Sequence, residues 1–234
     1  MKIWEKGIET HKKILEFTIG KDRELDLKIA EADIVASIAH VKMLLKTGLI
    51  TKEDEEGISG VLLECYEELQ QGSLVIGEGI EDIHSLLEYK LTEKLGESGK
   101  KVHTARSRND QVLTALKLYY RDELVQIAQL VSRLAETLLI RAEENSDVLM
   151  PGYTHMQAAM KSSFGLWFSA WAEAFTEDIR FLKAIKEYLN SNPLGSAAGY
   201  GSSFPIDREM TTHLLNSNRD MKRISHLVRE AIAR

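Results

Sequence analysis

The residues best suited to bind an anion occur just before a long apolar repeat, in the segment KKVHTARSRNDQVLTAL (residues 100–116). Asn109 and Asp110 stand where a helix is expected to begin, and two arginines, Arg106 and Arg108, precede that start. The first N–H groups of a helix lack intrahelical partners and carry the positive end of its dipole, while arginine can bind a carboxylate through two parallel hydrogen bonds. Two interpretations fit this spacing equally well. One is a site that binds a carboxylate or phosphate, and the other is a helix cap whose arginines face water.

A second polar group surrounds His155 in the segment MPGYTHMQ (residues 150–157), which should form a turn. Thr154 precedes the histidine, and Gln157 follows two positions later. A lone histidine is usually structural, but a neighbouring hydroxyl and amide could hold its ring in one tautomer. Proton transfer near neutral pH requires such control.

A third unusual segment, NPLGSAAGYGSSFPIDRE (residues 192–209), is rich in glycine and serine. One interpretation is a flexible linker. The other is a loop whose backbone closely approaches a ligand or a neighbouring helix, because glycine permits both tight turns and close contact.

The elements that position these segments should be helices, because apolar residues recur at three- and four-residue spacing and prolines are few. Helices are expected at 22–46, 51–71 and about 81–95, each followed by a glycine. These helices predict a small N-terminal helical domain over residues 1–102. The single cysteine, Cys65, lies among apolar residues at helical spacing, which predicts a buried thiol without a chemical role.

Two much longer helices are expected at 109–144 and 158–189, and residues 103–234 should form part of a central long-helix bundle. The aromatic stripe from Phe164 to Phe175 is best explained by core packing. The first long helix is apolar on more than one side, so we expect other subunits to cover it. The segment 216–234 has the pattern of an amphipathic helix, with its apolar positions at Met221, Ile224, Leu227, Val228 and Ile232.

Composition excludes several classes of protein. The net charge is −6 and no run of Lys and Arg could follow a phosphate backbone, so a nucleic-acid partner is not expected. No segment approaches the roughly 18 consecutive apolar residues of a membrane span. The charged start, MKIWEKGIETHKK, has no apolar core of a secretory signal, which predicts a cytoplasmic location.

The three polar segments together resemble motifs of the argininosuccinate lyase family, within the fumarase and aspartase superfamily. The resemblance is carried by HTARSRNDQV, PGYTHMQ and NPLGSAAGYGSSFPIDRE, with weaker matches at EFTIGKDREL and GIEDIH, and covers roughly residues 3–215. It implies an all-α, fumarase/aspartase-like fold. It also implies reversible elimination of fumarate from argininosuccinate to give arginine, without a metal or an organic cofactor, in a homotetramer whose sites are shared between subunits.

The same resemblance implies roles for individual residues. The substrate carboxylates would be bound by Ser107, Arg108 and Asn109, with Arg108 as the strongest anchor. Thr154 and His155 would be the catalytic residues beside the fumarate half, and Gln157 would support their loop. Thr18 and Asp22 would contact the arginine half. His84 is more often a structural group.

One departure from the family opens alternatives. Family members are about twice as long, and their later half contributes a mobile Gly-Ser-Ser loop, joined to a Met-Pro and a Lys-Lys-Asn-Pro run, that supplies the catalytic serine; this combined run is absent here. The chain is therefore expected to be a fragment, an incomplete sequence or a natural short form. The alternative function is a non-catalytic, lyase-like helical scaffold. Another lyase of the superfamily, such as one acting on adenylosuccinate, fits the first motif less well.

Overall fold

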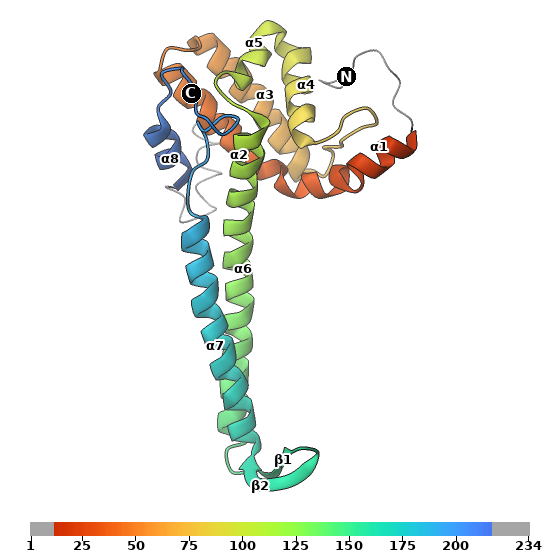
Figure 1. Cartoon of the computed structure of the whole chain (residues 1–234), viewed down its shortest axis with the longest axis vertical. Helices are drawn as coiled ribbons and strands as arrows, with labels where there is room; N and C mark the ends of the chain where they lie inside the picture. Colours follow the sequence, from red (N-terminus) through yellow and green to blue (C-terminus); the bar gives the residue numbers. More distant parts are fainter. Residues whose placement is uncertain (1–11, 217–234) are drawn as a thin grey trace. The chain divides into compact units, whose positions relative to one another are not determined.

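The computed structural model describes residues 12–216 of the chain, and these residues are mainly helical, with one short β-hairpin (Figure 1). They fall into two compact units, described separately below: one contains the residues up to Tyr119 and those from Ser191 onward, and the other is Tyr120–Asn190. The predicted all-α class is confirmed. The proposed domain boundary at residues 102 and 103 stays a prediction, and the helix predicted for 216–234 lies almost entirely outside the described residues.

The first unit contains the short helices of the chain and the start of the long helix α6. Its elements are α1 (Lys12–Ile19), α2 (Asp22–Lys46), α3 (Lys52–Gln70), α4 (Ile83–Leu95), α5 (Glu97–Lys100), a 3-10 turn (Lys101–His103), the first part of α6 (Arg108–Glu144) and α8 (Arg208–Asn216). Three of the predicted helices are confirmed within two residues. The short helices α1, α5 and α8 were not predicted.

Local sequence explains where these helices begin. Thr51 caps α3 in a reciprocal box: its hydroxyl accepts from the Asp54 amide at 3.2 Å, while the Asp54 carboxylate accepts from the Thr51 amide at 3.0 Å. Asp82 caps α4 by accepting from the Ser85 amide at 2.6 Å. Both caps fix the first turns of helices in this unit.

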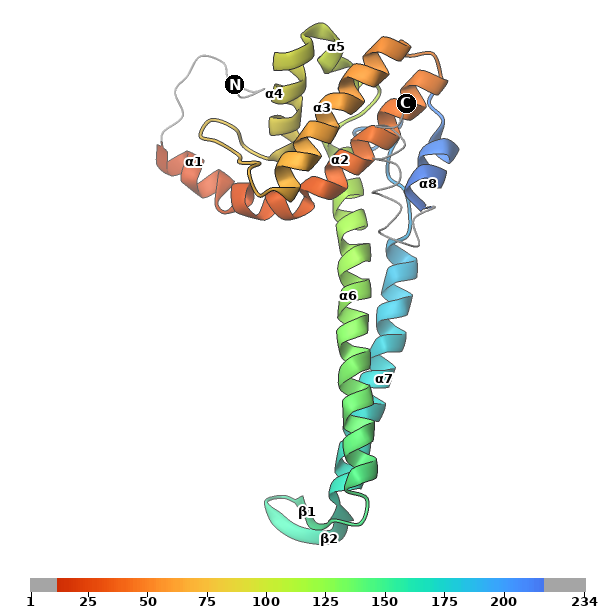
Figure 2. The same ribbon diagram turned by 180° about the vertical axis from the view of Figure 1, so that it is seen from behind.

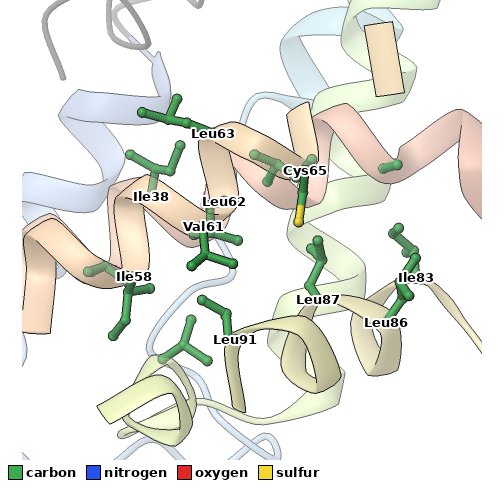
Figure 3. Close-up of a cluster of buried hydrophobic side chains, with 14 of the residues drawn as sticks. Ile38, Ile58, Val61, Leu62, Leu63, Cys65, Ile83, Leu86, Leu87 and Leu91 are labelled. Atoms are coloured by element: carbon green, nitrogen blue, oxygen red, sulfur yellow. The ribbon is translucent and has the colours of Figure 1, made fainter. Parts of the chain in front are cut away.

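The core of this unit lies between α2, α3 and α4, which lie side by side in both views (Figures 1 and 2). Figure 3 shows the α3 side chains Ile58 and Leu62 facing Leu87 and Leu91 of α4. All four are nearly or fully buried, and each such side chain contributes about 1.5–3 kcal/mol to folding. Cys65 belongs to the same cluster, and burial raises its pKa to about 11, as expected of an unreactive thiol.

The second unit consists of the rest of α6, α7 (Phe164–Leu189) and a hairpin formed by β1 (Leu149–Thr154) and β2 (Gln157–Ser163). The two helices run alongside each other in both views (Figures 1 and 2). They meet closely where α7 begins: a Cβ at Gly165 would lie 2.7 Å from the Ala142 carbonyl oxygen. The Gly165 amide donates to the Asn145 carbonyl at 3.1 Å. Glycine is therefore required at this contact.

The predicted helix over residues 158–189 begins too early. Residues 158–163 pair with β1 as an antiparallel strand, and α7 starts only after Ser163, whose hydroxyl accepts from the Leu166 amide at 3.1 Å. The hairpin hydrogen bonds satisfy the backbone of a segment whose alanines otherwise favour a helix, and serine provides the cap.

The prediction of core packing for the aromatic stripe of α7 does not hold within one chain. Trp167 is 48% exposed and Trp171 is 51% exposed, because this unit offers α7 a single long helical neighbour. Several apolar side chains of α6 are likewise open to solvent, namely Ile127, Leu130, Leu134, Leu139 and Ile140.

None of the helices between residues 12 and 216 combines the length and apolar character required to cross a membrane.

Candidate functional site

The polar end of α6 is organised by its own first turn. The Ser107 amide donates to Asp110 Oδ1 at 2.9 Å, and the Asn109 amide donates to the Ser107 hydroxyl at 3.3 Å. These contacts satisfy two amides that would lack partners at a helix start. Ser107, Arg108 and Asn109, which the sequence predicted to bind carboxylates, are consecutive residues of this turn.

Arg108 points to acidic and hydroxyl groups of its own chain. Its Nη1 lies 2.5 Å from Asp82 Oδ2, its Nη2 donates to the Ser85 hydroxyl at 3.1 Å, and Glu88 Oε2 lies 3.8 Å from Nη2. Burial opposes ionisation of Asp82, but the hydrogen bonds from Ser85 and the charge of Arg108 outweigh it and lower the Asp82 pKa. The guanidinium is therefore held in place by groups of its own chain, with part of the Arg108 side chain still open to solvent.

Arg106 differs from Arg108, although the sequence treated the two arginines alike. It is only 7% exposed and donates from Nη1 to the Ser37 hydroxyl of α2 at 3.0 Å. Burial lowers its pKa, opposed by the charges of Asp33, Glu88 and Asp110. Arg106 is therefore a buried structural cation, and the interpretation in which both arginines face water is wrong.

A buried ion pair lies behind the first turn of α6. His84 Nδ1 is 2.8 Å from Asp33 Oδ2, and Gln111 donates to the same carboxylate at 3.0 and 3.2 Å. Burial disfavours both charges, but their mutual attraction and hydrogen bonding outweigh it, so the Asp33 pKa is lowered and the His84 pKa is raised. This buried pairing agrees with the structural role that the sequence favoured for His84.

The glycine-rich segment folds back onto α6. The amides of Gly195 and Ala197 donate to Asp110 Oδ2 at 3.1 and 2.8 Å. Gly195 has a φ of 91°, and a Cβ there would lie 2.8 Å from Ile206 Cδ1. Of the two interpretations of this segment, the close approach of its backbone to a helix is confirmed.

Thr18 and Asp22 lie in the same unit, at the neighbouring ends of α1 and α2. The Thr18 hydroxyl donates to the Ile14 carbonyl at 2.9 Å, and Asp22 is the exposed first residue of α2. A carboxylate is favourable at a helix start because it faces the positive end of the dipole. Contact of these two residues with an arginine-like group stays a prediction.

Thr154, His155 and Gln157 lie in the second unit, at the tip of the hairpin. Thr154 pairs with Gln157, leaving His155 and Met156 as a two-residue turn with φ of 51° and 62°. Both residues are exposed. Within residues 12–216, neither Thr154 nor Gln157 hydrogen-bonds the imidazole, so the predicted control of its tautomer by these neighbours is not found. Positive φ at both turn positions matches the twist of a tight hairpin.

The predicted site residues therefore form two groups in two separate units. Ser107, Arg108 and Asn109 lie beside Asp82, which the sequence analysis did not select, and Asp110, which it placed at the helix start without a role in the site. The spacing of Ser107 and Asp110 is that of a capping box, and this signal could have identified Asp110. In the described part of the chain, no three His, Cys, Asp or Glu side chains are grouped so that they could hold a metal ion.

Comparison with known proteins gives three kinds of match. A sequence model of the family described as Lyase matches residues 10–227. The chain is 51% identical over 214 residues to an argininosuccinate lyase from Bacteroides thetaiotaomicron, covering 92% of this chain and 48% of the relative. It is 42% identical over 218 residues to an argininosuccinate lyase from Thermotoga neapolitana, covering 93% and 55% of the two chains. The chain spans about half the length of the curated relatives it matches.

Solved structures resemble the chain over most of its length. An EDDS lyase in complex with formate has a TM-score of 0.71 and 26% identity, with 88% of this chain and 41% of that chain covered. A class II fumarase from Schistosoma mansoni has a TM-score of 0.70 at 19% identity, covering 92% and 50%. The second match bears on the fold alone.

Proposed function

Because the chain belongs to the lyase family, we propose that it is an argininosuccinate lyase, or the corresponding half of one, which cleaves argininosuccinate reversibly into arginine and fumarate. The observation that carries the proposal is the alignment with curated argininosuccinate lyases, in which about half of the aligned residues are identical. The geometry of the α6 start supports it, because a partly exposed arginine next to the side chains of Ser107 and Asn109 suits a dicarboxylate.

The chemistry of such an elimination explains the need for Arg108. Removing a proton beside a carboxylate builds additional negative charge on that carboxylate, and donors aimed at the growing charge lower the barrier. Arg108, Ser107 and Asn109 supply a guanidinium, a hydroxyl and an amide from one helical turn. Arg108 would keep some of its five donors on Asp82 and Ser85 and present the rest to substrate.

His155 and Thr154 are proposed to act on the fumarate half, with Gln157 as a supporting residue. An exposed histidine at a hairpin tip is accessible to a substrate that another surface binds, and imidazole exchanges protons near neutral pH. Thr18 and Asp22 are proposed to contact the arginine half, where a carboxylate can pair with an α-amino group. The elimination as proposed needs neither metal nor organic cofactor.

A homotetramer in the cytoplasm, with sites shared between subunits, completes the proposal. The exposed apolar side chains of α6 and α7 support association, because a monomer rarely leaves such long apolar helical faces uncovered. Site residues that occur in two separate units are also compatible with a site built from more than one copy of the chain.

A second candidate function is a lyase-like scaffold without turnover. The specific observation in its favour is that the given sequence spans about half the length of its curated relatives and does not contain the run in which Gly-Ser-Ser is joined to Met-Pro and Lys-Lys-Asn-Pro. Such a protein would keep the helical fold and could still bind fumarate.

One experiment separates these possibilities. Purified chain is mixed with argininosuccinate while fumarate is followed by ultraviolet absorbance, and fumarate binding is measured by calorimetry on the same sample. Turnover supports the lyase; binding without turnover supports the scaffold; neither at millimolar ligand contradicts both. The intact mass of the protein from its native source is measured in parallel, because a value well above 26.4 kDa identifies the chain as part of a longer protein.

A further inference from the structure

Asp110 joins two segments that are far apart in the sequence but adjacent in the first unit. Its Oδ1 accepts from the Ser107 amide at 2.9 Å, within the first turn of α6. Its Oδ2 accepts from the Gly195 amide at 3.1 Å and from the Ala197 amide at 2.8 Å. One carboxylate therefore binds three backbone donors from both sides.

Because Asp110 is buried, losing any of these hydrogen bonds would cost more free energy than losing one at the surface. The residue is 1% exposed, so water cannot replace a lost partner. Hydrogen bonds from backbone amides to a charged carboxylate are stronger than neutral ones, and a donor left unpaired in such a place costs the full desolvation penalty. The two segments should therefore move as one body.

The loop side of this contact is built to fit the carboxylate. Gly195 and Ala197 have φ values of 91° and 50°, which turn both amides toward Asp110. Successive amides in such conformations form a concave anion site, and here the anion belongs to the chain itself. The turn is closed further by the amides of Gly199 and Gly201, which both donate to the Ser196 carbonyl.

We propose that Asp110 is a positioning residue: it fixes the first turn of α6 to the glycine-rich loop and so sets the orientation of Ser107, Arg108 and Asn109. The part of this inference that concerns substrate rests on the proposed function. Asp110 itself does not touch substrate, since its oxygens are occupied by the three amides. The loop from Gly195 to Gly201 is then a structural part of the binding site.

The test uses the chain with Asp110→Asn, which keeps the shape of the side chain but directs an NH2 group toward at least one of the amide donors. Asp54→Asn is the matched control, because Asp54 is also buried and accepts a backbone amide at a helix start, in α3. Amide hydrogen exchange is measured by NMR, with the Leu62 amide as internal reference. Fumarate is then titrated into each protein.

We expect the Gly195 and Ala197 amides to exchange at least tenfold faster in Asp110→Asn, with Leu62 unchanged, and fumarate to bind at least tenfold more weakly. Asp54→Asn should leave these loop amides and fumarate binding within twofold of the parent. Unchanged loop exchange overturns the proposal, as does unchanged fumarate binding in a loosened variant. A parent chain that does not bind fumarate contradicts the proposed function instead, and the exchange result then decides the proposal.

A second pair of variants tests the same contact from the loop, in case Asp110→Asn does not fold. Gly195→Ala strains a φ of 91° and brings a Cβ within 3 Å of Ile206 and Arg208, whereas Gly201→Ala strains a φ of 80° in open space. We expect Gly195→Ala, but not Gly201→Ala, to shift the Ser107 and Asn109 amide resonances on the far side of the carboxylate. No shift in Gly195→Ala overturns the proposal.

Discussion

Arg108 and Asp82 form an ion pair, with Nη1 2.5 Å from Oδ2, that links the first turn of α6 to the residue capping α4. The pair is partly buried, with side-chain exposures of 27% and 28%. Under the proposed function, a dicarboxylate would meet a guanidinium that is already held in place by Asp82 and Ser85.

Replacing Arg108 by lysine should weaken this site. Lysine has a single charged nitrogen and cannot bond Asp82, Ser85 and a ligand carboxylate in the planar geometry of arginine. We expect fumarate to bind about 10- to 100-fold more weakly, which corresponds to roughly 1.4–2.8 kcal/mol. Calorimetric titration measures the change. Arg141→Lys, in an exposed pair with Glu144, is the control and should bind as the parent does; equal affinity in Arg108→Lys would contradict the anchor role.

The His84–Asp33 pair predicts a specific pH dependence of stability. The pKa of His84 is higher in the folded chain than in the unfolded chain, where it is about 6.5. The contribution of His84 to folding stability is therefore complete below about pH 6.5 and is lost as pH rises through the folded-state pKa. The lowered pKa of Asp33 means that its contribution is present above about 3.8 and is lost as pH falls through the folded pKa.

His84→Gln should therefore destabilise the fold most between about pH 4 and pH 6.5, by about 3 kcal/mol, because it leaves a buried carboxylate without its cation. The difference from the parent should shrink toward pH 9. Urea unfolding in mildly acidic and in alkaline buffer measures it. A difference that is the same in both buffers would show that His84 acts through packing alone.

His40 predicts that stability decreases as pH falls, which is opposite to the pH dependence expected from His84. It is buried, its Nε2 donates to the Thr104 carbonyl at 2.9 Å, and burial, together with the nearby Arg106 charge, lowers its pKa to about 3. In the unfolded chain His40 takes up a proton near pH 6.5, whereas in the folded chain it stays neutral until a much lower pH. The free energy of unfolding therefore falls by about 1.4 kcal/mol per pH unit below about pH 6.5. His40→Gln should flatten the decrease between pH 6 and 4 in the same unfolding experiment, and an unaltered slope would contradict it.

Two glycines in helices should respond oppositely to alanine. A Cβ at Gly165 would lie 2.7 Å from the Ala142 carbonyl oxygen and from Ser146 Cα, so backbone must move, at a cost of about 1–3 kcal/mol. At Gly60, inside α3, nothing lies within 4 Å of the new Cβ, so Gly60→Ala should gain about 0.5–1 kcal/mol of helix stability. Urea unfolding of both variants checks the signs, and destabilisation by Gly60→Ala would be inconsistent with this account.

The sequence predicted the helices well because their signals are local. The start and end of α2 and the cap at Thr51 depend on apolar spacing and on residues within one turn. The hairpin was missed for a physical reason: its strands are mostly exposed on both faces, so no alternation of apolar and polar residues marks them.

The site could be predicted only in part, because its specificity depends on distant partners. Arg106 and Arg108 have similar neighbours in the sequence, but their partners are distant and different. Arg106 bonds Ser37, 69 positions away, and Arg108 bonds Asp82, 26 positions away. The role of Asp110 likewise depends on amides 85 and 87 positions away. The residue types marked this turn as a candidate site, but they could not distinguish the buried Arg106 from the partly exposed Arg108.

The hairpin tip allows the imidazole of His155 to be tested separately from its backbone. His155 and Met156 both have positive φ, a conformation that asparagine and glycine adopt more readily. His155→Asn should therefore keep the hairpin at least as stable while removing the proton-transfer group. Met156→Gly should relax the turn and keep the imidazole.

In any preparation that turns over argininosuccinate, His155→Asn should lower fumarate production about 100-fold or more, because general acid–base groups contribute at least this much. Met156→Gly should retain turnover within a few-fold of the parent. The ultraviolet assay for fumarate measures both. Full activity in His155→Asn would remove the histidine from the mechanism. An equal loss in both variants would show that the shape of the turn, and not the imidazole, determines the rate.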